Sequence, residues 1–586
     1  MLAYVFNSDT NIKSNNLKWA AEQYLNRKSP TYAETVGGKE ISFDMLLPEE
    51  AFDYACQDTA NTYALFLFFN KTLLPVCKKV LKIDCNLVKA VADYYAPNKI
   101  TIDNDLMFDV GMELRERRDE IERKLLKLMG RSVLNGINLN SPDQVSEVLQ
   151  EMGISTKVFS EKTGKMSVDQ ASLEKLDHPV ADLLIEHGSL STQISTYADK
   201  LSKVSSGRMN IKLFTASTGR TAIGDDRDSK SSSESFYIPF NFQNMTKPNT
   251  SLFRKEFVGD DPKNENLVFG YKFTELKNGE EKGLDPLEIV EGMSGNYNIR
   301  KAITVPERNK KDWYFVSLDY VAEELRIIGG LSKDPVYLKA FLEDKDIYKT
   351  VGSSMFGVPY EDITKNQRKK AKICVLGLNY GGSYMTIVRN GKISEDEAKE
   401  TEKIYWNSVP VLREWKREMV ERASSEYFIE MTYEDYLNRE NREISDLLKT
   451  AKRVPYMTRS AYGRIRWLGS FLGSPKRSMR KYGIRSVVSH IVQGTAADVM
   501  REVLYDLYKE VFIKYDKYIK FSGCIHDEID VCIRKDSLEL LDLVKSIMIK
   551  RPPGCSIDLT VGTEVGYSYG FLFPFQKDNN GVWICK

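Results

Sequence analysis

The sequence predicts a multidomain protein of the α+β class. Its 586 residues are enough for about four folding units of ~150 residues each. Hydrophobic residues make up 42% of the chain and charged residues 28%, which is ordinary globular usage and excludes a disordered or fibrous protein. The strongest strand signals, near residues 313–319 and 519–533, stand among longer segments with helical periodicity.

Overall composition excludes several classes of protein. Lys and Arg number 84 against 83 Asp and Glu, so the formal net charge of +1 gives no sign of a polyanionic partner, and only local charge can do so. The four histidines argue against a histidine-built metal centre. The eight cysteines form no C-x-x-C pair, which predicts a reduced, intracellular protein in the cytoplasm. No apolar run reaches the ~20 residues of a membrane span, and no membrane partner is expected.

Helices and polar segments are predicted in this order along the chain. Apolar residues at helical spacing predict helices over 16–24 and 48–69. Residues 104–130 predict a long helix whose mixed-sign charges form a solvated face. Two highly polar stretches, 222–298 and about 425–450, predict loops or insertions.

Two regions predict strands that end in carboxylates. Residues 313–319, rich in aromatic and β-branched side chains, end in Asp319. Residues 519–525 and 529–533 flank a three-residue His-Asp-Glu turn that contains Asp527, which predicts a hairpin with acids at its tip. If the strands are sheet neighbours, the two aspartates converge and can hold two Mg²⁺ ions about 3.5–4 Å apart for in-line phosphoryl displacement. Taken singly, an aspartate at a strand end is far more often a turn or capping residue than a metal ligand.

Local charge indicates a polyanion. Residues 451–485 contain ten Lys or Arg, no acid and several interleaved aromatic residues. The alternative is a basic surface without a partner. A second basic cluster opens a helix at Lys365, in which Arg368, Lys372, Leu376 and Tyr380 recur every four residues and so share one face. This stripe suits a ligand with a phosphate tail and a flat ring; an amphipathic helix with a basic end is the alternative.

The order of these motifs resembles family A DNA polymerases, the DNA polymerase I group in its Klenow-like form, with phage-like features. Asp319-Tyr-Val-Ala-Glu-Glu-Leu-Arg326 resembles the family's first palm motif. Residues 368–381 resemble its fingers helix, and His526-Asp527-Glu528 its second palm motif. The matching motifs span some 390 residues in the family's order.

The resemblance implies a right-hand polymerase with an antiparallel palm sheet and helical fingers and thumb. The expected segments are a partial α/β 3′–5′ exonuclease-like segment at 1–75, a thumb at 76–205, a first palm part at 206–345 with an insertion at 246–298, fingers at 346–499 and a second palm part at 500–586. The implied setting is cytoplasmic, with the cytoplasm of a phage-infected host as one case.

The resemblance also implies roles for individual residues. The metal ligands would be Asp319, Asp527 and the backbone carbonyl of Tyr320, with Glu528 in support; two Mg²⁺ ions are expected, with Mn²⁺ as a substitute. Arg368 and Lys372 would hold the triphosphate, and Lys372 is a candidate proton donor to pyrophosphate. Leu376, Tyr380, Glu324 and His526 would contact the incoming nucleotide, with Glu324 excluding a 2′-hydroxyl. The implied contacts to primer–template DNA are Arg220, Gln243, Asn244, Arg300, Asn138, Asn140, Lys200, Arg464, Arg466, Arg485 and Gln493.

Three departures from the family pattern carry further expectations. Leu376 stands where the family usually has Phe or Tyr, so altered discrimination against dideoxynucleotides is expected. Tyr54 and Asp58 resemble the last exonuclease motif, but the earlier acidic motifs are missing. This predicts no proofreading by this chain alone, with a separate exonuclease chain or a processivity factor as possible partners. The insertion at 250–297 is expected to be a surface loop or a docking site.

The resemblance predicts template-directed DNA synthesis from dNTPs, with pyrophosphate release. Two alternatives remain open at this stage. One is a non-catalytic nucleic-acid-binding accessory protein, against which the joint presence of both aspartates, Arg368 and Lys372 argues. The other is a single-subunit RNA polymerase, which Glu324 disfavours.

Overall fold

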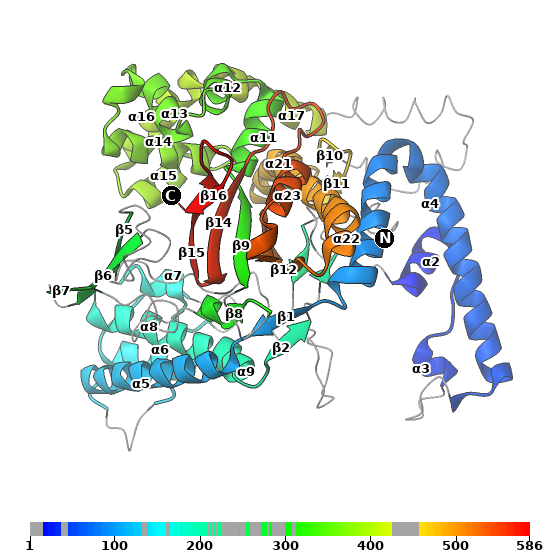
Figure 1. Ribbon diagram of the computed structural model, residues 1–586, viewed down its shortest axis with the longest axis horizontal. Coiled ribbons are helices and arrows are strands. Elements are labelled where there is room, and N and C mark those ends of the chain that lie inside the picture. The colour runs from blue at the N-terminus through cyan, green and yellow to red at the C-terminus, as the bar shows by residue number, and fades with distance from the viewer. Residues whose placement is uncertain are drawn as a thin grey trace.

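A computed structural model describes most of the chain (Figure 1). The described residues are 16–36, 45–131, 137–156, 158–159, 164–176, 178–208, 211–213, 216, 220–223, 245, 253–257, 271–277, 280–283, 299–306, 312–424 and 456–585.

An antiparallel sheet forms the centre of the molecule (Figure 1). Within the described residues it has nine strands, in the order β12-β13-β9-β14-β8-β1-β2, and β15 pairs with β14 while β16 pairs with β15. Its strands are β1 (Lys99–Ile102), β2 (Ser206–Arg208), β8 (Ile303–Thr304), β9 (Trp313–Tyr320), β12 (Ile519–Ile525), β13 (Glu528–Arg534), β14 (Val561–Ser568), β15 (Phe571–Lys577) and β16 (Trp583–Cys585). The sheet therefore joins segments that are more than 200 residues apart in the sequence, as the predicted palm requires.

The two predicted strand regions form the buried middle of this sheet. β9 and β13 are buried along almost their whole length, and β13 buries Asp530 among its apolar residues. β9 pairs with β13 on one side and β14 on the other, and β12 pairs with β13 as the predicted hairpin.

Helices that follow β9 cover one end of the sheet (Figure 1). They are α11 (Glu323–Ser332), α12 (Pro335–Leu342), α13 (Ile347–Phe356), α14 (Lys365–Leu378), α15 (Tyr384–Gly391), α16 (Glu395–Ser408) and α17 (Pro410–Ser424). Asp346 and Ser394 cap α13 and α16 by accepting backbone N–H groups in the first turn. A hairpin of β10 (Met457–Arg459) and β11 (Ile465–Trp467) leads through α20 (Gly469–Leu472) to the 31-residue α21 (Arg477–Leu507).

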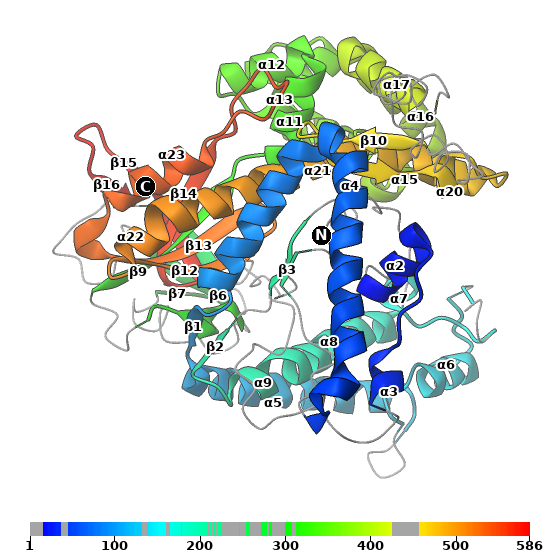
Figure 2. The ribbon, with the colours of Figure 1, turned by 90° about the vertical axis from the view of Figure 1, so that its right-hand side faces the viewer.

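A second group of helices lies at the opposite end of the sheet (Figures 1 and 2). α5 (Asn104–Leu128) packs on α8 (Pro179–Gln193), with α6 (Pro142–Glu151), α7 (Gln170–Leu173) and α9 (Asp199–Leu201) nearby. The predicted helix at 104–130 is confirmed. Its buried side chains include Leu114, Ile121 and Leu125, while Lys124 and Glu120 pair on its exposed face at 2.6 Å.

The described part of the N-terminal segment is helical. α2 (Leu17–Leu25) confirms the predicted helix at 16–24, and α3 (Tyr32–Thr35) follows it. The helix predicted at 48–69 is α4 (Pro48–Ala90), a 43-residue helix that crosses the molecule in Figure 2 and packs on α2 and α21. It continues through residue 75, the expected segment boundary, and ends in a π turn, η2 (Val91–Tyr95). Tyr54 and Asp58 lie on α4, and the absence of proofreading stays a prediction.

The polar insertion contains strands. β5 (Phe253–Phe257), β6 (Tyr271–Lys277) and β7 (Glu280–Gly283) form a separate three-stranded antiparallel sheet. The expectation of a loop at 250–297 was therefore wrong for these residues. The high charge of the segment hid the strands, because a strand is recognised in a sequence by an apolar run or by alternating apolar and polar residues. The second expected loop, at 425–450, lies outside the described residues. Among the helices that the structure describes, none is both long and apolar enough to cross a membrane.

Candidate active site

The pairing of β9 with β13 brings Asp319 and Asp527 to the same end of two neighbouring strands. Glu528, the first residue of β13, lies opposite Asp319 near the end of β9, and Asp527 immediately precedes it. The backbone N–H of Tyr320 donates to the Asp527 carbonyl oxygen at 3.2 Å, which extends the ladder by one step. Asp319 and Glu528 are directly opposite each other, and residues so placed on paired strands have Cβ atoms about 4.5–5.5 Å apart, so Asp527 is the next residue along from this close pair. The prediction that these strands are sheet neighbours is confirmed.

The hairpin tip is tighter than predicted. Glu528 already pairs with Ile525, so His526 and Asp527 alone form the turn. His526 has φ of 59°, a left-handed conformation that costs a non-glycine residue free energy and persists where its surroundings enforce it. The turn exposes His526 and leaves Asp527 partly buried. Burial raises the pKa of Asp527, and the nearby Glu324 carboxylate adds to this, so a cation beside Asp527 would favour its ionised form.

Glu528 lies in a different environment from Asp527. Its Oε1 accepts a hydrogen bond from the hydroxyl of Ser317, which lies two residue pairs farther along β9, at 2.6 Å. Asp530, which lies opposite Ser317, is buried beside it, and burial together with the Glu528 charge raises the pKa of Asp530 well above its usual value. Glu528 thus has a structural partner within the sheet, and its supporting role in metal binding stays a prediction.

The first turn of α11 adds two glutamates to the site. Glu324 forms an ion pair with Arg220. Glu323 is 5% exposed, and its Oε1 has no hydrogen-bond partner among the described residues. Burial and the charges of Asp527 and Glu324 raise the pKa of Glu323 well above its usual value. Both glutamates follow Ala322, whose left-handed φ of 54° starts the helix abruptly after β9.

A small cavity joins these groups. It is lined by Arg220, Thr221, Glu323, Ala496, Ala497, Met500, His526 and Asp527. The sequence reasoning missed Glu323, although it stands next to Glu324. Two adjacent acids at a helix N-terminus are favourable to the helix dipole wherever they point, so the sequence carries no signal that one is buried.

Three members of the predicted stripe, Arg368, Lys372 and Leu376, lie on α14, which ends at Leu378, so Tyr380 stands in the turn just beyond the helix. Arg368 and Lys372 both lie over the ring of Tyr348, at 5.3 and 5.6 Å from its centre. Leu376 is 47% exposed, and Tyr380 is partly buried. The buried side chains of the opposite face are Ala371, Cys374, Val375 and Leu378.

Both ends of the stripe already bind carboxylates. Arg368 donates twice to one oxygen of Asp346, at 2.6 and 3.0 Å. At the other end, burial raises the pKa of Tyr380, and so do the charge of Glu324 and its hydrogen bond with the hydroxyl. Tyr380 and Arg220 therefore meet at Glu324, which connects α14 to the small cavity beside Asp527.

The predicted DNA contacts fall into different environments. Asn138, Asn140 and Arg485 are exposed, and Lys200 and Gln493 are partly exposed. Gln243 and Asn244 lie outside the described residues. Three of the arginines predicted to contact DNA are buried: Arg300, Arg464 and Arg466.

The burial of these arginines contradicts a role as open DNA contacts. Arg464 is 2% exposed and binds Asp84 at 2.8 Å and Asp498 at 2.6 Å. Arg300 donates to the Met245 carbonyl at 2.9 Å and to the Tyr569 hydroxyl at 2.6 Å. We therefore assign Arg464 and Arg300 to the core, and the 6% exposure of Arg466 places it there as well.

The basic tract nevertheless has an exposed part. It begins just before α21 and continues along its first turns, and its members are Lys476, Arg477, Arg480, Lys481 and Arg485. Arg485 packs against Gly381, next to Tyr380, so this surface reaches the end of the α14 stripe.

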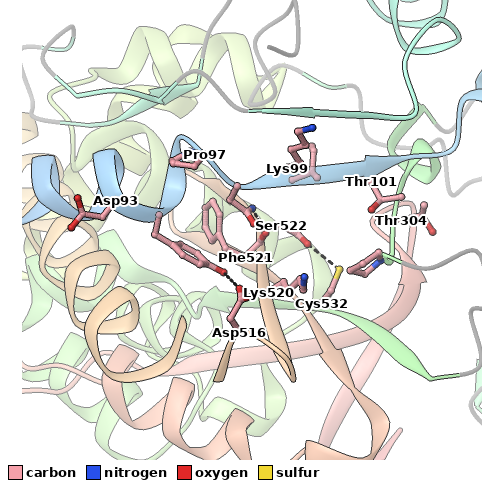
Figure 3. A pocket seen from close by; sticks show the side chains of 14 residues that line it. Asp93, Pro97, Lys99, Thr101, Thr304, Asp516, Lys520, Phe521, Ser522 and Cys532 are labelled. Carbon is pink, nitrogen blue, oxygen red and sulfur yellow. Dashed lines mark hydrogen bonds between the residues drawn. The ribbon is translucent and has the colours of Figure 1, made fainter. Parts of the chain in front are cut away.

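A larger cavity of about 360 Å³ lies at the edge strand β12, between β12 and the η2–β1 connection (Figure 3). Its lining mixes Lys99 and Lys520 with Asp93 and Asp516. The Asn98 amide donates to the Phe521 carbonyl at 2.7 Å and bridges β12 to the β1 segment. None of the candidate catalytic residues lines this cavity.

Comparison with known proteins gives one consistent result. The model of a family described as DNA polymerase family A matches residues 105–227 and 288–571. The unmatched residues between these ranges include the separate sheet β5–β7, as expected for an insertion relative to the family model. DNA polymerase I of Pseudomonas aeruginosa is 24% identical over 579 residues, covering 95% of this chain and 52% of that protein. The thermostable DNA polymerase I of Thermus aquaticus is 25% identical over 465 residues, covering 79% of this chain and 45% of that protein.

The fold has a solved counterpart. The POL domain of Pol1 from M. smegmatis, in complex with DNA primer-template and dNTP, matches with a TM-score of 0.65 at 20% identity, over 97% of this chain and 81% of that chain. The chain spans about half the length of the curated relatives named above.

Proposed function

Because this chain belongs to DNA polymerase family A, we propose that it is a DNA-directed DNA polymerase. It would extend the 3′-hydroxyl of a primer with deoxynucleotides selected by a template strand, and release pyrophosphate. The single observation that carries the proposal is the pairing of β9 with β13, which sets Asp319 opposite Glu528, the residue after Asp527, at the end of β9 that leads into α11.

The donor set fits Mg²⁺. Asp319 is exposed, Asp527 is partly buried, and Tyr320 follows Asp319 and donates its backbone N–H to the Asp527 carbonyl. Mg²⁺ uses one or two carboxylates and completes its shell with water and substrate phosphates, so two aspartates are a sufficient protein contribution. Two ions bound there would activate the primer hydroxyl and neutralise charge at the transferring α-phosphate.

The cations of α14 would bind the triphosphate. Arg368 is held by Asp346 in this structure, so the nucleotide would share or replace that carboxylate. Lys372 is exposed one turn along the same face and would supply a second positive charge. Proton donation by Lys372 to the leaving pyrophosphate is part of this proposal.

Tyr380 and Glu324 would form the other wall of the nucleotide site. The ring of Tyr380 would pack by the templating base pair, while Glu324 would lie under the sugar. The exposed basic residues of α21, from Lys476 to Arg485, would bind the DNA backbone, because clustered cations neutralise phosphates.

Primer extension tests this proposal directly. The chain is incubated with a primer–template duplex, Mg²⁺ and either dNTPs or NTPs. Extension with dNTPs that requires Mg²⁺ is the expected result. Duplex binding without extension would instead support an accessory protein, and preferential use of NTPs would support an RNA polymerase.

Glu324→Ala is expected to relax sugar selection. Removing the side chain opens space for a 2′-hydroxyl, and pockets that exclude one small group discriminate by about 10–100-fold, so a loss of that size is expected. The ratio of kcat/KM for dNTP over NTP measures it. Glu343→Ala, at an exposed acid beyond α12, is the control. An unchanged ratio in Glu324→Ala would refute the assignment.

Leu376→Phe is expected to change discrimination between deoxy- and dideoxynucleotides. The exposed Leu376 lies between Lys372 and Tyr380, where a ring adds contact area against the nucleotide. An added aromatic contact is worth about 0.5–1.5 kcal/mol, equivalent to a change of about 2–10-fold. Competition between dNTP and ddNTP in single-nucleotide extension measures this ratio. Leu376→Met, which adds no ring, is expected to match the wild type; equal values in all three proteins would contradict the assignment.

A further inference from the structure

The end of α14 has a tightly defined backbone. The Gly381 N–H donates to the Leu378 carbonyl and the Gly382 N–H to the Gly377 carbonyl, both at 3.1 Å. Gly381 has φ of 84°, so these bonds form the glycine-ended cap common at helix C-termini. Tyr380 stands between the helix and this cap, and its orientation therefore depends on how firmly the last turn is held.

Buried polar side chains surround this turn. The Asn379 amide donates to the Tyr337 hydroxyl at 2.8 Å, and the Tyr405 hydroxyl donates to the Asn379 oxygen at 2.7 Å. On the following helix, the Tyr384 N–H donates to Glu402 at 3.1 Å. α12, α15 and α16 thus all contribute to holding the junction between α14 and α15.

Lys416 of α17 completes this set. Its Nζ donates to the Leu378 carbonyl at 2.7 Å, and it lies over the ring of Trp406, 4.5 Å from the centre. The Lys416 side chain is partly buried. Among the described residues, the negative charge of Glu402 on α16 favours the charged form of Lys416. A cation at a helix C-terminus is also favoured by the helix dipole.

We propose that Lys416 is a positioning residue for nucleotide addition: its bond to the Leu378 carbonyl fixes the last turn of α14 and thereby places Tyr380 against the incoming nucleotide. The inference rests on the proposed polymerase function. The Leu378 carbonyl keeps its bond from Gly381 when Lys416 is removed, so loss of the lysine loosens the turn without leaving a buried carbonyl unpaired.

The charge of Lys416 is expected to change near neutral pH. Burial lowers the pKa of Lys416 from its ordinary 10.5 to about 7, and Glu402 only partly opposes this. Below pH 7 the ammonium group makes a charge-assisted bond to the carbonyl, and above it the neutral amine makes a weaker one. Nucleotide binding through Tyr380 should therefore weaken as the pH rises through about 7.

Linkage gives an independent check on this titration. Charging a lysine whose folded pKa lies below its unfolded value costs folding free energy. That cost grows as the pH falls from 10.5 towards 7 and is constant below 7. Lys416→Met removes it, so the stability of this variant relative to the wild type should rise as the pH is lowered through this range.

Three variants test the inference in the full chain. Lys416→Met is expected to raise the KM for dNTP about tenfold, the value of one charge-assisted hydrogen bond, with little change in kcat. Lys416→Arg keeps the charge and the donor, so its KM for dNTP should be near the wild-type value. Unlike the wild type, this variant should show no rise in KM above pH 7. Lys403→Met, at an exposed lysine of α16, should match the wild type.

Hydrogen exchange supplies a readout that does not depend on activity. Amides 377–382 should exchange faster in Lys416→Met than in the wild type or Lys403→Met. Unchanged exchange or an unchanged KM in Lys416→Met would overturn the inference, as would identical pH profiles of KM for the wild type and Lys416→Arg. A wild-type chain that fails to extend primers would instead refute the proposed function, while the exchange experiment would still decide whether Lys416 holds this turn.

Discussion

Asp527→Asn is expected to reduce nucleotide addition by about 10³-fold, the size of effect seen when one preorganised electrostatic group is removed from an active site. The amide keeps the shape of the side chain but lacks the charge that holds a divalent cation beside the primer hydroxyl. Asp319→Asn should have an effect of the same order, because the two carboxylates would share the ions. Single-turnover primer extension at saturating dNTP and Mg²⁺ measures the chemical step.

A matched control is available on the same strand pair. Asp536 follows the far end of β13, where it pairs with Arg534 at 2.7 Å on the protein surface. Asp536→Asn is expected to leave the rate unchanged, because exposed ion pairs contribute little. If Asp527→Asn retained activity within about tenfold of this control, Asp527 would not be an essential group.

Arg464→Met is expected to destabilise the fold by about 3–5 kcal/mol, the cost of removing one partner from a buried ion pair. Asp498 would lose its ion pair with Arg464, and Asp84 would lose one of the two arginines that bind it among the described residues and keep Arg501 at 2.7 Å. Burial already raises the pKa of Asp498, with Arg464 opposing this, so removing Arg464 would raise that pKa further. Urea unfolding measures the free energy of unfolding.

Lys481→Ala provides the contrast within the same basic tract. Lys481 is exposed on α21, so its removal should change stability by less than about 0.5 kcal/mol. It should instead weaken duplex binding and reduce the salt dependence of binding. The assignment of Arg464 to the core would be wrong if Arg464→Met weakened DNA binding without loss of stability, while Lys481→Ala lost stability without weaker DNA binding.

Arg464 and Lys481 show which features of the structure can be predicted from the sequence and which cannot. Residues with a strong local pattern were predicted well: β9, the β12–β13 hairpin and the α14 stripe follow from apolar runs and from the spacing of Arg368, Lys372, Leu376 and Tyr380. Their positions depend on neighbours within a few residues. The placement of Asp319 and Asp527 at the same end of β9 and β13 required only that two predicted strands pair.

Long-range partners were not predictable. Arg464 and Lys481 belong to one charge cluster, yet Arg464 pairs with Asp84, 380 residues away. Charge counting cannot distinguish a cation that meets a distant acid from one that meets solvent. The same limit applies to Glu323, whose burial depends on the cavity formed with Arg220 and Asp527, and to Lys416, whose partner is a backbone carbonyl on another helix.

The most direct test of the central claim is a crystal structure of the chain with primer–template, a non-extendable primer end, a matching dNTP and Mn²⁺. Anomalous scattering would locate the metal ions independently of any assumption about ligands. We expect two peaks between the carboxylates of Asp319 and Asp527, with the triphosphate reaching Arg368 and Lys372. Metal peaks elsewhere, or a bound dNTP with Asp319 and Asp527 too far apart to share an ion, would contradict it.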